Sequence, residues 1–249
     1  MSANLPLDRV LVIAPHPDDE SIGTGALIQR VAEAGGVLRV VVLTDGDNNL
    51  WPQRIAARKW SISPEDRARW GAMRREESRN ALAELGVPAS SATFFGYHDR
   101  TLTRLAKRGE PGILESLKEL IESFNPTLVV SPSILDLHAD HRAAARFAHE
   151  AAPDRLIVTY IVHGNGPVSR IAVRLELRPE EVARKRDAIK RHKSQLGLSG
   201  ARFLSYARPV EVFFRAEHDI LRPDTLWWKW RCKTLHGWRV VRGVGASES

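Results

Sequence analysis

Cysteine is nearly absent from this chain of 249 residues, and Cys232 is its only example. A single cysteine excludes an intrachain disulfide and a thiolate metal cluster within one chain, and it fits a reducing compartment. No run of about 18 apolar residues occurs, and the start MSANLPLDRV lacks a basic segment followed by an apolar one. We therefore expect a cytoplasmic protein with neither a signal peptide nor a membrane-spanning helix.

Two common enzyme motifs are also missing. The segment GTGALI, which begins at Gly23, lacks the third glycine of a dinucleotide-binding loop. No G-x-S-x-G sequence exists to form the nucleophile turn of a serine hydrolase. These absences disfavour a nicotinamide-dependent enzyme and a serine hydrolase.

Positive charge is in excess. Lysine and arginine number 37 against 30 acidic residues, which gives a formal net charge of +7 and a pI near 9.9. This balance favours anionic partners, and nucleic acid, anionic lipid and phosphorylated sugars all qualify.

Short runs rich in β-branched or aromatic residues alternate with helical patterns along most of the chain. The expected strands are residues 9–14, 37–44, 92–97, 127–131, 155–162, 170–177 and 209–217. The expected helices are residues 21–35, 63–86, 112–124, 138–152 and 178–196, and the second is capped by Ser63. The alternation predicts the α/β class, with a Rossmann-like, mostly parallel sheet and helices on both faces. The C-terminal strands and helix complete the same domain, which we place at residues 1–217.

The remaining segment, residues 218–249, differs in composition. It contains four of the seven tryptophans, interleaved with lysine and arginine: Trp227, Trp228, Trp230 and Trp238. Tryptophan favours the membrane–water boundary, and each basic residue near an anionic surface adds about 1 kcal/mol. The segment therefore suggests peripheral contact with an anionic membrane. The alternative is that these rings pack on the protein's own core.

Two clusters of histidine and aspartate follow predicted strands. The first is APHPDDE, from Ala14 to Glu20, and the second is HADH, from His138 to His141. Ligands bind at the carboxyl ends of the strands in open α/β sheets, so the two clusters are expected to meet there. His16, Asp19 and one of the two later histidines would give two nitrogen ligands and one oxygen ligand. Such a set suits Zn²⁺ with an open fourth position.

These motifs resemble the LmbE-like or PIG-L family of zinc-dependent N-deacetylases. The resemblance covers roughly residues 8 to 215, and it includes TDGD from Thr44, RREE from Arg74 and GYHDRTL from Gly96. It implies that His16, Asp19 and His141 bind zinc and that Asp18 is the general base. It also implies that His138 either stabilises the oxyanion or protonates the leaving amine. Arg74 and Asp99 match positions that contact substrate in the family.

Two features depart from the family pattern. Asp136 stands where some members carry a tyrosine implicated in catalysis, and the tryptophan-rich segment has no counterpart. From the chemistry of such sites, we expect Asp140 to orient a histidine without binding the metal itself. We expect Glu20 to orient the backbone at the start of a helix. We expect His163 to be packed or exposed rather than part of the site.

The sequence thus predicts a hydrolase that uses Zn²⁺ to remove an N-acetyl group from an amino sugar or sugar conjugate, such as a glycolipid or cell-surface polysaccharide precursor. A metal-dependent phosphoesterase would share histidines and carboxylates, but it usually needs more carboxylates to hold two ions. A non-catalytic nucleic-acid-binding protein would explain the positive charge but not the paired motifs. We expect no specific nucleic acid partner.

Overall fold

Seven strands form one sheet within residues 5–216, which are the residues that the computed structural model describes. Their order across the sheet is β3-β2-β1-β4-β5-β7-β6. The strands span Arg9–Ala14 (β1), Val37–Thr44 (β2), Ala92–Tyr97 (β3), Leu128–Pro132 (β4), Ile157–Tyr160 (β5), Ile171–Glu176 (β6) and Val210–Arg215 (β7). β1 to β5 run parallel, whereas β7 is antiparallel to both of its neighbours, β5 and β6. The predicted class, a mostly parallel α/β sheet, is confirmed.

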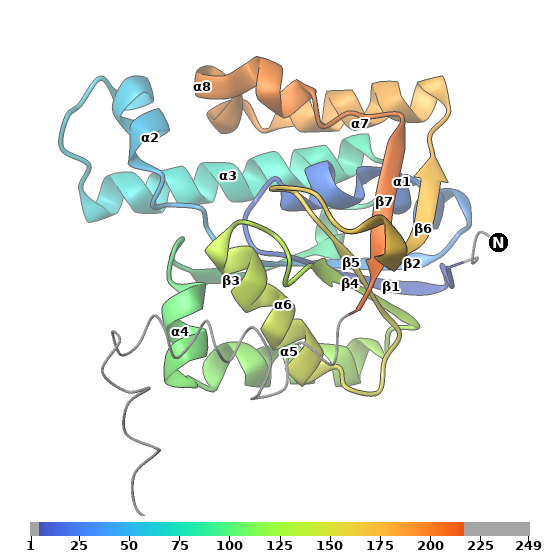
Figure 1. The fold of residues 1–249 in the computed structure, drawn as a ribbon. Coiled ribbons are helices and arrows are strands. Elements are labelled where there is room, and N and C mark those ends of the chain that lie inside the picture. The colour runs from blue at the N-terminus through green and yellow to red at the C-terminus, as the bar shows by residue number, and fades with distance from the viewer. Residues whose placement is uncertain (1–4, 217–249) are drawn as a thin grey trace, which may run out of the picture. The chain divides into compact units, whose positions relative to one another are not determined.

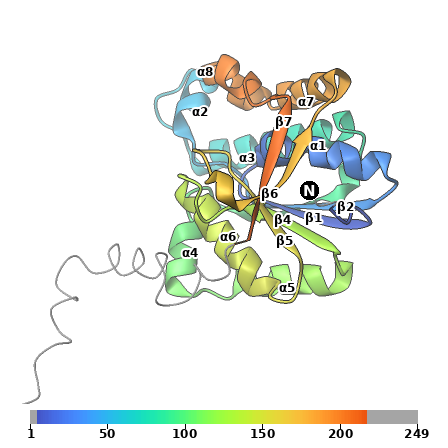
Figure 2. The same cartoon turned by 45° about the vertical axis from the view of Figure 1, so that its right-hand side comes forward.

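Helices cover both faces of this sheet (Figure 1). They span Asp19–Glu33 (α1), Leu50–Ala57 (α2), Pro64–Glu84 (α3), Leu102–Arg108 (α4), Gly112–Phe124 (α5), Ala139–Ala151 (α6), Pro179–Arg191 (α7) and Lys193–Leu204 (α8). Figures 1 and 2 show α1, α3, α7 and α8 on one side of the sheet and α4, α5 and α6 on the other.

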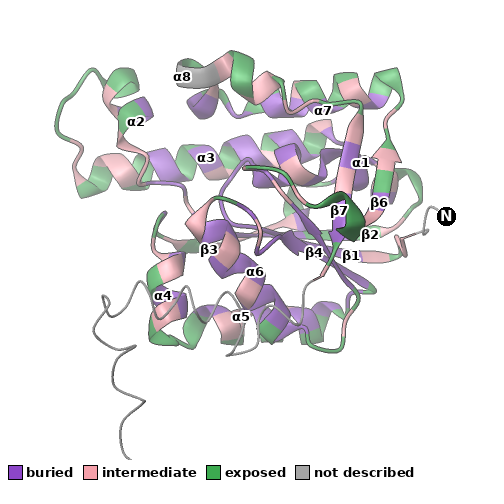
Figure 3. Cartoon of the chain, viewed as in Figure 1, coloured by how far each residue is buried: buried purple, intermediate pink, exposed green. Residues whose placement is uncertain are grey.

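The strand β1 shows why the sheet needs both helical layers. Its side chains alternate between two apolar clusters, with Val10 and Val12 on one face and Leu11 and Ile13 on the other. All four are fully buried, which is why the strand reads as a continuous apolar run rather than an alternating one. Figure 3 shows the resulting buried centre between the two layers.

The strand order reverses at β1, which pairs with β2 on one side and with β4 on the other. The connection after β1 therefore leads to one side of the sheet and the connection after β4 leads to the other. Such a switch point leaves a crevice at the carboxyl ends of the two strands. The segments that begin there are the two clusters, PHPDDE and HADH.

Helix boundaries follow local signals in some places. Ser63 caps α3 as predicted: its side chain accepts a hydrogen bond from the N–H of Asp66, whose carboxylate accepts one from the N–H of Ser63.

The single helix predicted over 178–196 is wrong, because the chain leaves helical geometry at His192, where φ is −79° and ψ is 59°. The His192 ring is buried, and its Nε2 lies 3.0 Å from the hydroxyl of Ser21. Contact with α1 thus divides the predicted helix into α7 and α8.

An ion pair between α7 and β7 also makes hydrogen bonds to the backbone of α1. Lys185 is buried, and its Nζ donates to Glu211 at 2.6 Å and to the carbonyl of Ile22 at 2.8 Å. Glu211 accepts the backbone N–H groups of Ala26 and Leu27 in turn. These side-chain hydrogen bonds to its backbone tie α1 to the C-terminal elements.

No helix among the described residues is both long and apolar enough to cross a bilayer. The tryptophan-rich segment and its predicted membrane contact lie outside the described residues.

Candidate active site

The loop between β1 and α1 supplies the first group of polar side chains. Asp19 opens α1, and its Oδ2 accepts a hydrogen bond from the N–H of His16 at 3.0 Å. The same oxygen lies 3.1 Å from Nδ1 of the His16 ring. The turn therefore brings the two side chains together before any other element takes part.

The segment between β4 and α6 supplies the second group, and Asp136 organises it. Its Oδ1 accepts the N–H of His138 at 2.8 Å, where α6 begins. Its Oδ2 lies 3.2 Å from Nδ1 of His141 and accepts the N–H groups of Val162 and His163, at 2.8 and 3.1 Å. Asp136 thus fixes the start of α6 against the end of β5, and it fixes the His141 ring.

The two groups meet at Asp19. Its Oδ2 lies 3.2 Å from Nε2 of His141, so one carboxylate oxygen stands between imidazole nitrogens from both clusters. Ligand-type atoms of His16, His138 and His141 lie within 4.8 Å of one another. Those of His16, Asp99 and Asp140 form a second such group.

The chemistry of this cluster fits a metal ion. His141 Nε2, His16 Nε2 and Asp140 Oδ2 are buried and none has a partner in hydrogen-bond geometry among the described residues, although carboxylate oxygens of Asp19 and Asp99 lie 3.2 and 3.0 Å from the two nitrogens. Buried polar atoms are seldom left unpaired, and imidazole nitrogens with a carboxylate are ordinary ligands of Zn²⁺ and related cations. The His/Asp cluster is therefore able to hold a metal ion.

The histidines and carboxylates of the cluster shift one another's pKa values. Burial lowers the pKa of His141, but Asp19 and Asp136 outweigh it and raise that pKa to about 9. Burial also opposes protonation of His16, but the nearby carboxylates, led by Asp140 and Asp19, raise its pKa well above the ordinary value. Burial would raise the pKa of Asp19, yet the two histidines hold it well below its usual range. A cation bound here would compete with protons for the same atoms.

Asp18 lies beside the cluster in an unusual conformation. Its φ of 138° is one that residues other than glycine rarely adopt, and its backbone N–H donates to Glu20 at 2.9 Å. Arg74 donates from Nη2 to Asp18 Oδ2 at 2.9 Å and also to the carbonyl of Pro17. Glu20 thus orients the backbone here, as predicted. Backbone strain of this kind is concentrated at functional sites.

Burial raises the pKa of the Asp18 carboxyl to about 7, although the Arg74 guanidinium acts in the opposite direction. A carboxyl with a pKa near 7 can accept and return a proton under ordinary conditions.

Two further groups have shifted pKa values. Burial, together with the positive charge of His16 and His141, lowers the pKa of His138 to about 4, which keeps its ring neutral near pH 7. Burial raises the pKa of Asp99, but its contact with His16, 3.0 Å from Oδ1 to Nε2, outweighs this and gives a pKa of about 2. Asp99 is therefore a carboxylate across the pH range in which His138 is neutral.

A cavity of about 280 Å³ opens over these groups. His16, Asp18, Asp19, Arg74, Asp99 and His138 all line it. Its remaining lining residues come from α1, from α2 and the residue before it, from the segments after β3 and β5, and from α8 and the turn after it: Ile22, Asn49, Pro52, Arg100, Val162, His163, Gln195, Arg202, Phe203 and Tyr206. A larger cavity of about 920 Å³ between α2, α3 and α8 has no histidine among its lining residues, so we place the chemistry in the smaller one.

The structure brings every predicted site residue to this region. His141 and Asp140 are the two that do not line the cavity; they lie buried behind it. Asp140 Oδ2 is 3.8 Å from His16 Nε2, and its Oδ1 accepts hydrogen bonds from Thr103.

Two residues take places that the sequence analysis did not foresee. Asp136, noted there only as a departure from the family pattern, contacts His141 directly. His163, expected outside the site, lines the cavity, and its ring centroid is 5.4 Å from that of His138. Both placements depend on the segment just after β5, whose backbone N–H groups donate to Asp136. No local signal in the sequence places this segment beside α6.

The sequence also matches a known protein family. The profile of the PIG-L family, described as GlcNAc-PI de-N-acetylase, matches residues 11–152, which include both clusters. The chain belongs to the PIG-L family.

Several PIG-L relatives are similar over parts of their length. A 1D-myo-inositol 2-acetamido-2-deoxy-alpha-D-glucopyranoside deacetylase of Streptomyces griseus is 32% identical over 165 residues, covering 60% of this chain and 50% of the relative. A probable N-acetyl-alpha-D-glucosaminyl L-malate deacetylase 2 of Bacillus anthracis is 28% identical over 199 residues, covering 75% and 81%. The chain spans half or less of the length of the first curated relatives that it matches.

The PIG-L fold is also found in solved structures. The N,N'-diacetylchitobiose deacetylase from Pyrococcus horikoshii matches with a TM-score of 0.65 at 23% identity, over 82% of each chain. At this identity the likeness establishes the fold alone.

Proposed function

We propose that this protein is a zinc-dependent N-deacetylase that removes an acetyl group from an amino sugar or sugar conjugate of the N-acetylglucosamine type. The observation that carries the proposal is the position of Asp19 Oδ2, 3.1 Å from His16 Nδ1 and 3.2 Å from His141 Nε2 at the base of a cavity. The names of the Streptomyces griseus and Bacillus anthracis relatives support the substrate class.

Zinc is the metal that we assign, with His16, Asp19 and His141 as its ligands. Two imidazoles and one carboxylate are a ligand set found in catalytic zinc sites. When bound, zinc supplies Lewis acidity, which makes water more acidic and polarises an acyl carbonyl.

Asp18 is the general base in this proposal. Arg74 holds Oδ2, so Oδ1 is left to accept a proton from the attacking water. The raised pKa of this carboxyl, about 7, lets it take the proton and then give it to the departing nitrogen. The contact with Arg74 holds this carboxylate at the cavity wall, and Asp18 directly precedes the proposed ligand Asp19.

His138 stabilises the oxygen of the acyl group as charge develops on it, or protonates the leaving amine. Its ring stands 5.0 Å from those of His16 and His141, centroid to centroid, and its Nδ1 is buried without a hydrogen bond to a described residue. A neutral ring in this position can donate one hydrogen bond to an oxyanion. Asp99 and the Arg74 guanidinium, which also line the cavity, are the groups that we propose to contact the sugar.

Acetate release from a panel of N-acetylglucosamine derivatives, with and without a chelator, tests the proposal. Activity that is lost on chelation and restored by zinc is the expected result. Asp18→Asn should keep its zinc and lose about 10²-fold or more in kcat, the usual scale for a general base. Phosphatase activity on phosphomonoesters in the same sample, with no acetate released from any derivative, would replace this proposal with a phosphoesterase.

The cellular location of this activity is a separate proposal. The single cysteine supports a cytoplasmic protein, and the composition of residues 218–249 supports peripheral contact with an anionic membrane. Sedimentation with anionic liposomes at low and high salt tests the second point. The full-length protein should sediment, and a full-length variant with Lys229, Arg231, Lys233 and Arg239 replaced by glutamine should not.

A further inference from the structure

A buried carboxylate lies next to Asp18, the proposed general base. Glu20 is fully buried in the first turn of α1, and its Oε2 accepts the backbone N–H of Asp18 at 2.9 Å. Burying a carboxylate is costly unless its oxygens have partners. The N–H of Asp18 serves one oxygen, so the other needs partners from elsewhere in the fold.

Ser21 and His192 supply those partners. Oε1 of Glu20 accepts the hydroxyl of Ser21 at 3.1 Å and lies 3.2 Å from Nε2 of His192. The same nitrogen is 3.0 Å from the oxygen of Ser21. In the described part of the chain, Nδ1 of His192 has no hydrogen-bond partner. The ring therefore acts on this group through Nε2 alone.

The segment that carries His192 is itself held in place. His192 stands between the end of α7 and the start of α8, and Figure 1 shows both helices on the same side of the sheet as α1. Two residues later, Ser194 donates its N–H and its hydroxyl to the buried Glu77 of α3, at 2.8 and 2.6 Å. These hydrogen bonds keep the His192 ring against Glu20.

The conformation of Asp18 is the reason that this contact matters. Its φ of 138° is rarely adopted by residues other than glycine, and such strained conformations persist only where the surrounding structure holds them. Arg74 contacts the Asp18 carboxylate and the carbonyl of Pro17. Glu20 holds the residue on its other side, through the backbone N–H.

Resting on the proposed deacetylase function, we propose that His192 is a positioning residue for the general base. Through Glu20 it holds the backbone of Asp18, so that the Asp18 carboxylate faces the attacking water. Proton transfer depends steeply on the distance and orientation of the two groups. Loss of the His192 contact therefore lowers kcat and leaves zinc bound, because the ring contacts Glu20 and Ser21 rather than the proposed ligands.

Steady-state kinetics of the zinc-loaded, full-length protein tests this role. His192→Leu removes Nε2, and kcat should fall about tenfold or more with KM and zinc content nearly unchanged. His192→Gln should recover most of the loss, because its amide nitrogen is as many bonds from the backbone as Nε2 is. Ser21→Ala, which suits a helix and removes the hydroxyl between Glu20 and His192, should give a smaller loss. Unchanged kcat in both His192→Leu and Ser21→Ala would overturn the proposal.

Lys185→Met is the matched control for His192→Leu. Lys185 is also buried, belongs to α7 and contacts α1, but it does so through the carbonyl of Ile22. At a temperature where both variants are folded, Lys185→Met should keep kcat nearly unchanged. Equal losses of kcat in the two variants would mean that any loosening of α1 slows turnover, and would overturn a specific role for His192.

A double-mutant cycle identifies the residue through which His192 acts. If that residue is Asp18, adding His192→Leu to Asp18→Asn should lower kcat no further than Asp18→Asn does alone. Losses that multiply in the double variant would overturn the proposal, since His192 would then affect turnover by another route.

Amide hydrogen exchange, measured by NMR, separates this inference from the proposed function. In His192→Leu, the N–H of Asp18 should exchange about tenfold or more faster relative to the N–H of Ile28, in the middle of α1. Unchanged exchange would overturn the positioning role, even if acetate is released. Faster exchange in a protein that releases no acetate from any N-acetylglucosamine derivative would support the hold on Asp18 and overturn the deacetylase.

Discussion

Nδ1 of His141 lies 3.2 Å from Oδ2 of Asp136, and both side chains are completely buried. The carboxylate fixes the ring so that Nε2 faces Asp19, where the proposed metal ligands meet. A carboxylate behind a ligating histidine typically sets the ring orientation and strengthens the nitrogen as a ligand.

We therefore expect Asp136→Asn to weaken zinc binding by about 10- to 100-fold, the usual effect of removing such a partner. Competition with a chromophoric chelator measures the affinity. Asp187→Asn is the control, because Asp187 pairs with Lys190 at the surface of α7. Unchanged zinc affinity in Asp136→Asn would show that the carboxylate serves only the backbone groups that it holds.

His141→Ala should remove one of three proposed protein ligands and deplete both zinc and activity. Metal content of the purified variant, measured by mass spectrometry, checks this. His98→Ala should retain full zinc, since the His98 ring is exposed and contacts Asp47 instead. Full zinc occupancy in His141→Ala would require a different ligand set.

Gly46→Ala should disturb Arg74 and, through it, Asp18. A Cβ at residue 46 would stand 1.8 Å from Arg74 Nη1, and the φ of 60° there is also unfavourable for alanine. We expect kcat to fall by about tenfold or more through the loss of the Arg74–Asp18 contact, with zinc retained.

Gly35→Ala is the matched control for Gly46→Ala. Its φ is 71°, but nothing lies within 4 Å of the added Cβ, so it has the backbone cost of about 1 kcal/mol without the displacement. Similar kcat values in the two variants would mean that the contact with Arg74 is not needed for turnover.

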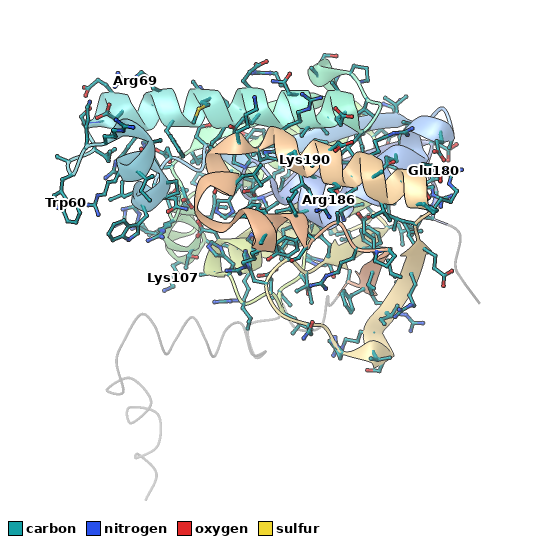
Figure 4. The ribbon with its side chains drawn as sticks, turned by 90° about the horizontal axis from the view of Figure 1, so that it is seen from above. Trp60, Arg69, Lys107, Glu180, Arg186 and Lys190 are labelled. Atoms are coloured by element: carbon teal, nitrogen blue, oxygen red, sulfur yellow. The ribbon has the colours of Figure 1, made fainter. Side chains whose placement is uncertain are left out.

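Lys185→Met should strongly reduce the free energy of unfolding, by about 3–5 kcal/mol, because it leaves the buried Glu211 carboxylate without its partner. Urea unfolding measures the change. Lys190→Met, on the exposed side of the same helix (Figure 4), should change stability by about 0.5 kcal/mol or less. Adding Glu211→Gln to Lys185→Met should recover part of the loss; no recovery would mean that packing of the lysine stem dominates.

The sequence by itself determined the elements whose signals are local. β1 and β2 are rich in valine and both have the predicted bounds, because strands that are buried on two faces over most of their length need apolar side chains there. Ser63 and Asp66 specify the start of α3 through their mutual hydrogen bonds. The PHPDDE and HADH motifs indicated a shared site, because each follows a parallel strand. By contrast, α2 and α4 were not predicted, since helices of eight and seven residues carry too little periodicity to be read.

Only the tertiary structure decided which atoms meet. Asp136 contacts His141 because β5 lies beside β4 and presents the N–H groups of Val162 and His163 to the same carboxylate. The helix predicted over 178–196 breaks at His192, where the buried ring contacts the hydroxyl of Ser21 in the first turn of α1. Arg100 and Arg202 are 102 positions apart in the sequence, and they share a cavity only because α8 folds back over the carboxyl end of the sheet. Contacts of this kind depend on side chains from distant elements, whose relative placement no local pattern encodes.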